Sequence, residues 1–221
     1  MLRRYLRAGF CKLFAVRKDF INAVREHQAA FDLHLSDEAI EHLTFYCELV
    51  QEHNSLLHLV APCSPEEFAV RHILESLTLL EHLPRNAKFA DVGTGAGLPS
   101  IPCMIIRNDL KAVLIESKIK KIGFLREVIA NLDLADRAEL HGKQFTEVKK
   151  PDNVSYVTCR ALDKFTAKLP HLINWSKNSV CLLFGGPSLR SAIKRCGIIF
   201  EETLLPMSEQ RYLFVTGETN C

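Results

Sequence analysis

Apolar residues recur every three to four positions through the first third of the chain, which is typical of helices. Residues 20–33 predict a first helix, and Ser36, a preferred helix-capping residue, predicts the start of a second. Residues 56–63 are expected to form a loop, after which Ser64 begins a Ser-Pro-Glu-Glu capping box for a third helix. No segment of residues 19–85 alternates like a strand, so we expect an N-terminal helical cap.

From Lys88 onward, short apolar runs alternate with helical patterns, of which residues 119–132 are the clearest. This alternation predicts βαβ units and a mostly parallel sheet within residues 86–221. The last two runs have only a short link, so we expect a hairpin that adds one antiparallel strand. The expected strands are Lys88–Val92, Lys111–Glu116, Ala138–His141, Val154–Cys159, Ser179–Phe184, Ile198–Leu204 and Tyr212–Thr216.

The first expected strand runs into a glycine-rich turn, D-V-G-T-G-A-G, which begins at Asp91. Glycine at every second position lets the backbone adopt left-handed conformations and approach a ligand closely. A dinucleotide fingerprint places its third glycine three residues after the second, whereas here the interval is two. The Asp91 carboxylate would also repel a pyrophosphate and attract a cation. The turn therefore resembles the first motif of S-adenosylmethionine (SAM) methyltransferases.

The composition of the chain excludes few classes of protein. The 221 residues are 48% hydrophobic and carry a net charge of +2. A net charge this small does not by itself indicate a protein that binds nucleic acid. Residues 1–18 hold six basic and no acidic residues, which indicates a solvated leader, with an RNA-touching basic helix or a targeting presequence as alternatives. No apolar run reaches about 18 residues, so no membrane span is expected. The eight cysteines form no C-x-x-C pair, which indicates reduced cysteines in a cytoplasmic protein and no metal site.

Other polar residues should reach the crevice of the glycine turn, because the carboxyl ends of parallel strands meet at one edge. Glu116 ends the second strand, 23 residues after Gly93, where a carboxylate can accept both ribose hydroxyls. Arg160 ends the fourth strand and either pairs with a carboxylate or faces substrate. Lys121 and Lys143 follow the second and third strands, as solvated side chains or as a basic rim that neutralises phosphate.

The last cap helix carries Arg71 and Glu75 at i,i+4 spacing, which predicts a surface ion pair beside a partly buried His72. Asn54 and His58 flank the preceding loop, where turn and capping roles are the simplest interpretation. Residue type alone singles out neither group as functional.

The motifs together resemble those of the RsmG/GidB family over about residues 35–217. The resemblance rests on R-H-I-L-E-S-L from Arg71 with D-V-G-T-G-A-G-L-P from Asp91, and is supported by Glu116-Ser117, Lys121, Phe124-Leu125, Arg160-Ala161 and Arg211. The cap loop keeps only Asn54 and Leu59 of the family pattern, Lys121 and Lys143 replace arginines, and Gly185-Gly186 replaces Lys-Gly. A lysine keeps the charge of an arginine but lacks its bidentate fork.

The resemblance implies an α/β class I SAM-dependent methyltransferase: a Rossmann-like, mostly parallel seven-stranded sheet with one antiparallel strand and an N-terminal helical extension. It implies SAM as cofactor, small-subunit (16S) ribosomal RNA or the small ribosomal subunit as partner, guanine N7 as methyl acceptor, and a monomeric, cytoplasmic enzyme. The expected cofactor-binding residues are Asp91, Gly93, Thr94, Gly95, Gly97, Leu98, Glu116, Ser117, Gln144, Phe145 and Arg160. The expected RNA-binding residues are Asn54, Arg71, His72, Lys121, Lys143, Arg160 and Arg211.

The implied reaction needs no general base, because guanine N7 has a free lone pair and no proton. No residue is therefore assigned as catalytic, and orientation of the reactants is expected to dominate. Three alternatives stay open. The chain could be a SAM methyltransferase for another RNA, a protein or a small molecule. It could be a nicotinamide-dependent oxidoreductase, against which the glycine spacing argues, or a non-catalytic ribosome-binding protein that retains SAM.

Overall fold

The computed structural model describes residues 16–217. Residues 16–27 are helical. The strands that follow in the chain are β1 (Lys88–Val92), β2 (Lys111–Ile115), β3 (Ala138–His141), β4 (Tyr156–Arg160), β5 (Val180–Gly185), β6 (Phe200–Leu204) and β7 (Tyr212–Thr216). The helices and helical turns are η1 (Gln28–Phe31), α2 (Asp37–Leu57), α3 (Pro65–Phe68), η2 (Ala69–Leu74), α4 (Glu75–Leu77), η3 (Thr78–His82), α5 (Ser100–Ile106), α6 (Ile119–Asn131), η4 (Phe145–Glu147), α7 (Phe165–Trp175) and α8 (Pro187–Arg195).

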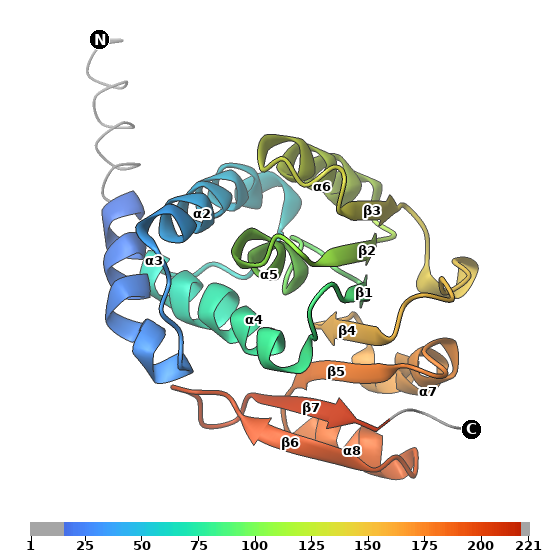
Figure 1. Ribbon diagram of the computed structural model, residues 1–221. Helices are drawn as coiled ribbons and strands as arrows, with labels where there is room; N and C mark the ends of the chain where they lie inside the picture. The colour runs from blue at the N-terminus through green and yellow to red at the C-terminus, as the bar shows by residue number, and fades with distance from the viewer. Residues whose placement is uncertain (1–15, 218–221) are drawn as a thin grey trace.

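The strands form one sheet in the order β3-β2-β1-β4-β5-β7-β6 (Figure 1). The first five are parallel neighbours, and β7 runs antiparallel to both β5 and β6. The predicted Rossmann-like sheet and its terminal hairpin are therefore confirmed. The register pairs Asp91 with Leu114 on one side and Thr158 on the other. The carboxyl ends of β1, β2 and β4 consequently open at one place on the sheet edge.

The predicted helix starts are confirmed at both capping serines. Ser36 Oγ accepts from the Ala39 N–H at 3.2 Å, and Ser64 Oγ accepts from the Glu67 N–H at 3.0 Å. The second half of the Ser64 capping box is replaced, because the Glu67 carboxylate binds Arg71. Helix α2 also continues through Leu57, two residues into the segment expected to be a loop.

The first helix starts earlier than the apolar pattern predicted. Residues 16–18, assigned to the basic leader, are helical. Arg17 ion-pairs with Glu48 at 2.9 Å and with Glu41, both on α2. These ion pairs place the end of the leader segment against the cap, and residues 1–15 lie outside the described part of the chain.

The cap and one face of the sheet share a single hydrophobic core. Cap side chains such as Phe20 and Phe68 belong to the same cluster as Phe89 of β1 and Leu114 of β2. Helices α2 and α4 contact α5 on this side, whereas α7 and α8 cover the other face, as Figure 1 shows. Residues 19–85 and this face of the sheet within residues 86–217 are thus packed around one shared core.

The state of the cysteines and the character of the helices can be compared with the expectations from composition. Cys103, Cys159 and Cys181 are free thiols and fully buried. Between residues 16 and 217, no helix has the length and apolar character needed to cross a membrane.

Candidate active site

The turn after β1 needs glycine at each of its three glycine positions, for different reasons. Gly93, Gly95 and Gly97 have φ of 72°, 60° and 95°, in the region that other residues rarely adopt. A Cβ at Gly93 would lie 2.6 Å from Leu162 Cδ1, and one at Gly97 would overlap Ile101. A Cβ at Gly95 would meet no atom closer than 3.8 Å. Gly93 and Gly97 therefore permit close packing, whereas Gly95 keeps the turn open for a ligand.

Asp91 lies beneath this turn and is fully buried. Its Oδ2 accepts from Thr94 Oγ1 at 2.7 Å and from Ser100 Oγ at 2.6 Å. Its Oδ1 is buried with no hydrogen-bond partner among the described residues. Burial without a counter-ion raises the pKa of the Asp91 carboxyl to about 7, although the two hydroxyl donors lower it. The side chain therefore holds the turn in place from below.

A cavity of about 440 Å³ lies against the glycine turn. This volume is in the usual range for a small-molecule site. The lining residues come from the cap loop, the ends of β1, β2 and β4, the segment after β3, and helices α6 and α7. They are Leu59, Val60, Ala61, His72, Gly93, Thr94, Gly95, Ala96, Leu98, Ile115, Glu116, Ser117, Lys118, Lys121, Lys143, Gln144, Phe145, Arg160, Ala161, Leu162, Asp163 and Lys168.

Glu116 is one of two acidic residues in the cavity lining and lies next to the turn. Its Oε2 accepts from the Gly95 N–H at 3.1 Å and its Oε1 accepts from the Lys118 N–H at 2.8 Å. A carboxylate oxygen has two lone pairs, so each oxygen can still accept one hydroxyl donor. Lys121 reaches the same region, and burial lowers the pKa of its ammonium while Glu116 raises it.

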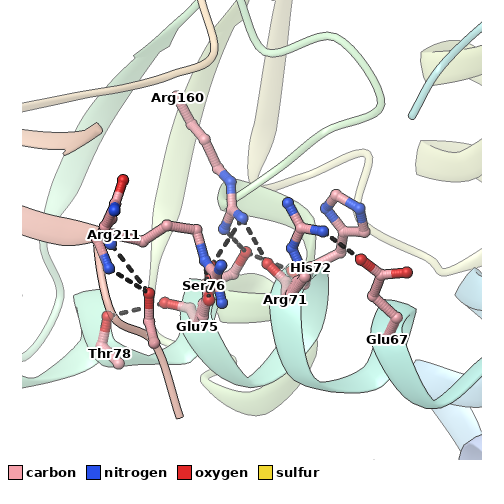
Figure 2. Close-up of polar contacts among 10 residues, drawn as sticks. Glu67, Arg71, His72, Glu75, Ser76, Thr78, Arg160 and Arg211 are labelled. Atoms are coloured by element: carbon pink, nitrogen blue, oxygen red, sulfur yellow. Dashed lines mark hydrogen bonds and ion pairs between the residues drawn. The ribbon is translucent and has the colours of Figure 1, made fainter. Parts of the chain in front are cut away.

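On the opposite side of the cavity, a cluster of arginines surrounds a buried carboxylate (Figure 2). Glu75 is fully buried, and its Oε2 lies 3.0 Å from Arg160 Nη2 while its Oε1 lies 2.6 Å from Arg211 Nε. The predicted surface pair between Arg71 and Glu75 is therefore wrong. Arg71 binds Glu67, one turn earlier, in the more favourable acid-first order along a helix.

Arg160 combines the two roles that the sequence left open, since it pairs with a carboxylate and also lines the cavity. Burial lowers the pKa of its guanidinium, and the Glu75 carboxylate raises it. Beside it, the His72 ring lies 5.2 Å from the ring of Phe68. Burial and the nearby arginines lower the pKa of His72 to about 3, so this wall presents a neutral imidazole.

The cap also holds the glycine turn directly. Tyr46, fully buried on α2, donates its hydroxyl to the Ala96 carbonyl at 2.9 Å. The cap loop, through Leu59, Val60 and Ala61, forms part of the cavity wall. A stable cavity therefore requires the cap as well as the sheet.

Comparison with known proteins agrees with this geometry. The model of the GidB family, described as rRNA small subunit methyltransferase G, matches residues 39–190. The chain belongs to the GidB family. Relatives named Ribosomal RNA small subunit methyltransferase G include one from Syntrophus aciditrophicus, 29% identical over 93% of this chain and 84% of its own length. Another, from Neisseria meningitidis serogroup B, is 32% identical over 67% of this chain and 69% of its own.

Solved structures at lower identity match the fold of this GidB-family chain. A precorrin-6y C5,15-methyltransferase from Geobacter metallireducens superposes with a TM-score of 0.51 at 16% identity, covering 66% of this chain and 88% of the other. The B. subtilis tRNA methyltransferase TrmK has a TM-score of 0.51 at 13% identity, with 64% of each chain covered. Family membership makes the chain a SAM-dependent methyltransferase.

The cavity brings together most of the residues expected to bind SAM. Asp91, beneath the turn, and Gly97, within it, are the two exceptions, because neither lines the cavity. The nine that line the cavity are Gly93, Thr94, Gly95, Leu98, Glu116, Ser117, Gln144, Phe145 and Arg160.

The residues expected to bind RNA divide into two groups. His72, Lys121, Lys143 and Arg160 line the cavity, whereas Asn54, Arg71 and Arg211 do not. Asn54 Oδ1 accepts from the Val60 N–H at 3.0 Å, so its side chain braces the cap loop, in line with the simpler turn role.

Several lining residues were not singled out from the sequence. Ala161, Leu162 and Asp163 follow β4, and the rule that ligands bind beyond the carboxyl ends of strands could have identified them. Lys168 lies inside α7, and residues 59–61 belong to a loop whose position depends on the cap. No local motif indicated Lys168, Val60 or Ala61, whereas Leu59 matched the family pattern in the cap loop.

Proposed function

We propose that this GidB-family methyltransferase transfers the methyl group of SAM to N7 of a guanosine in small-subunit ribosomal RNA. The observation that supports it is the composition of one cavity. The glycine turn, Glu116 and Lys121 lie together, and Arg160, Lys143 and Lys168 supply further cationic groups in the lining. A site of this kind can hold a nucleoside-like cofactor next to an anionic RNA.

The residues present fit SAM. The cavity has the size of a small-molecule site, and because Gly95 has no side chain, the space beside the turn stays free for a ligand. Glu116 retains acceptor capacity for ribose hydroxyls. Asp91 keeps an unpartnered carboxyl oxygen below the turn, which favours a cationic ligand group nearby. When bound, SAM supplies a methyl group on a cationic sulfur that a nucleophile can attack.

The protein would act by orienting the reactants. N7 of guanine needs no deprotonation, which agrees with a cavity lining that, in the described part of the chain, holds no base hydrogen-bonded to a nucleophile. Arg160 would donate to the guanine O6 or to a phosphate oxygen, and the lysines would neutralise backbone phosphates. The neutral ring of His72 adds a cavity wall without a further positive charge. The base must leave its stack to enter the cavity, as for other base-modifying enzymes.

The proposed substrate also defines the partner. We expect recognition of small-subunit ribosomal RNA, either naked or in the small ribosomal subunit, by a monomer in the cytoplasm. Lysine at positions 121 and 143 keeps the positive charge of the arginines in the family pattern.

The test is methyl transfer from labelled SAM to unmodified small ribosomal subunits and to naked small-subunit RNA, followed by nucleoside analysis. The expected product is 7-methylguanosine, and the better substrate identifies the recognised assembly state. A Glu116→Gln variant should bind SAM about tenfold more weakly, because one charged acceptor is lost. Glu139→Gln on β3 serves as control, since Glu139 is outside the cavity lining.

SAM binding without incorporation into either RNA would contradict the ribosomal RNA substrate. Label in another RNA, a protein or a small molecule would identify one of the alternative substrates. If a fluorescence titration showed that the protein binds NADH in place of SAM, the methyltransferase mechanism would be contradicted.

A further inference from the structure

Glu75 is a fully buried carboxylate whose two oxygens bind two different arginines. Arg160 comes from the end of β4 and Arg211 from the segment before β7, so three distant parts of the chain meet here (Figure 2). An arrangement of buried charges adds little to stability, because desolvation offsets the attraction between the charges. Its geometry is therefore the feature to explain.

Arg160 has five N–H groups, and the cluster engages three of them. Nη2 donates to Glu75 Oε2 at 3.0 Å and to the Arg71 carbonyl, and Nη1 donates to Ser76 Oγ at 3.4 Å. Among residues 16–217, the Nε–H and the second Nη1–H have no hydrogen-bond partner. A guanidinium presents paired donors only along its Nε–Nη2 and Nη1–Nη2 edges. Both of these edges include Nη2, whose hydrogens are already bound.

This restriction matters for the proposed reaction. An arginine that reads guanine usually donates to O6 and N7 together. Such a contact would cover the N7 lone pair, which must stay free to attack the methyl group. A single donor can bind O6 or a phosphate oxygen and leave N7 exposed.

We propose that Glu75, held by Arg211, is a positioning residue that limits Arg160 to single-donor contacts with the substrate guanine and so keeps N7 free for methylation. This proposal rests on the proposed function. Arg211 lies outside the cavity lining and binds Glu75 Oε1, whereas Arg160 binds Oε2. It therefore acts by fixing the carboxylate, without contact to the acceptor base.

The decisive variant is Arg211→Gln, because Arg211 is partly exposed, with a side-chain exposure of 34%. Arg190→Gln is the matched control, since Arg190 Nε binds Glu202 Oε2 at 2.6 Å with a side-chain exposure of 26%. The assay measures kcat and KM for the ribosomal RNA, SAM affinity by calorimetry, and thermal stability. We expect Arg211→Gln to lower kcat about tenfold with SAM affinity unchanged, and Glu75→Gln to lower it by up to about 100-fold. Arg190→Gln should match the wild type.

A second measurement addresses the single-donor contact. The target guanosine, located by mass spectrometry of nuclease fragments of the methylated RNA, is replaced by 2-aminopurine, which has N7 but no O6. In the wild type this substitution should lower kcat/KM, and in Arg211→Gln the additional loss should shrink, because Arg160 is no longer held in place. Equal losses in both proteins would contradict the proposal, as would an Arg211→Gln variant with wild-type kcat.

Failure of the proposed function is distinguishable from failure of this inference. If the wild type forms no 7-methylguanosine, the function proposed above is wrong. The positioning by Glu75 is then tested by nitrogen-15 NMR of the Arg160 guanidinium, assigned by its loss in Arg160→Lys. Slow rotation of Nη2 in the wild type that becomes fast in Arg211→Gln supports positioning, and equal rotation in both contradicts it.

Discussion

The buried carboxyl of Asp91 should make the stability of this protein fall as pH rises through the acidic range. Its pKa is raised from 3.8 to about 7, with burial as the largest cause. Below pH 3.8 the carboxyl is protonated in both the folded and the unfolded chain, and stability is unaffected. Above pH 3.8 the unfolded chain releases the proton while the folded chain keeps it, so the free energy of unfolding falls with each unit of rising pH.

The magnitude follows from the two pKa values. The interval from 3.8 to about 7, at about 1.36 kcal/mol per pKa unit, corresponds to about 4 kcal/mol of lost stability. The loss should be complete above about pH 7, where the folded protein also ionises. Because Asp91 is fully buried, solvent screening does not reduce this value.

The assay is urea denaturation of the wild type and of Asp91→Asn from about pH 4.5 to 8, without SAM. Asparagine keeps an oxygen acceptor for Thr94 and Ser100 but does not titrate, so the free-energy difference between the two proteins isolates this carboxyl. As pH rises, the free energy of unfolding of the wild type should fall relative to that of Asp91→Asn, and the difference should level off near pH 7. Asp109→Asn is the control, because Arg107 holds the pKa of Asp109 below its usual range and its effect falls in the most acidic part of the scale.

A free-energy difference that stays flat between about pH 5 and 7 would refute the reasoning, because Asp91 would then be ionised in the folded protein. SAM provides an independent check. If its ammonium group lies near the free Oδ1 of Asp91, saturating SAM should lower the pKa of this carboxyl and reduce the pH dependence. An unchanged slope with SAM bound would place the ammonium elsewhere.

Three further predictions concern the turn and the rim. Gly97→Ala should destabilise the protein by about 2–3 kcal/mol, because residue 97 has a positive φ and the added Cβ would overlap Ile101. Gly123→Ala, at an open position in α6, should instead stabilise the protein by about 0.5–1 kcal/mol. Denaturant unfolding measures both effects. Tyr46→Phe removes the hydroxyl bound to the glycine turn, and should cost about 1 kcal/mol and weaken SAM binding in calorimetry. Lys143→Gln at the cavity should reduce the salt dependence of RNA binding by about one phosphate contact, whereas exposed Lys194→Gln should not.

The sheet and the part of the cavity around the glycine turn could be predicted because their signals are local. Most strands are short, mainly apolar segments, and β1, β3 and β7 have the bounds that the sequence indicated. The glycine turn adjoins its strand, and Glu116 follows from its place at the end of the next strand. These features depend on neighbouring residues or on one rule of parallel sheets.

The arginine cluster could not be predicted in the same way. Helical spacing favoured a surface pair of Arg71 with Glu75, yet the partners of Glu75 are Arg160 and Arg211, 85 and 136 residues further along the chain. Spacing along one helix does not show which face becomes buried. That face depends on how the cap packs against β4 and β7.

The positions of Tyr46 and Glu75 argue that the cap is part of the catalytic machinery and not an attached RNA-binding module. Tyr46 holds the glycine turn, on the proposed cofactor side of the cavity, and Glu75 holds Arg160, on the proposed substrate side. A shift of the cap against the sheet would displace both sides together, because the cap and this face of the sheet share one core. Substrate RNA that contacts the cap would therefore influence the geometry of methyl transfer without touching SAM. Cap variants should accordingly change kcat as well as RNA affinity.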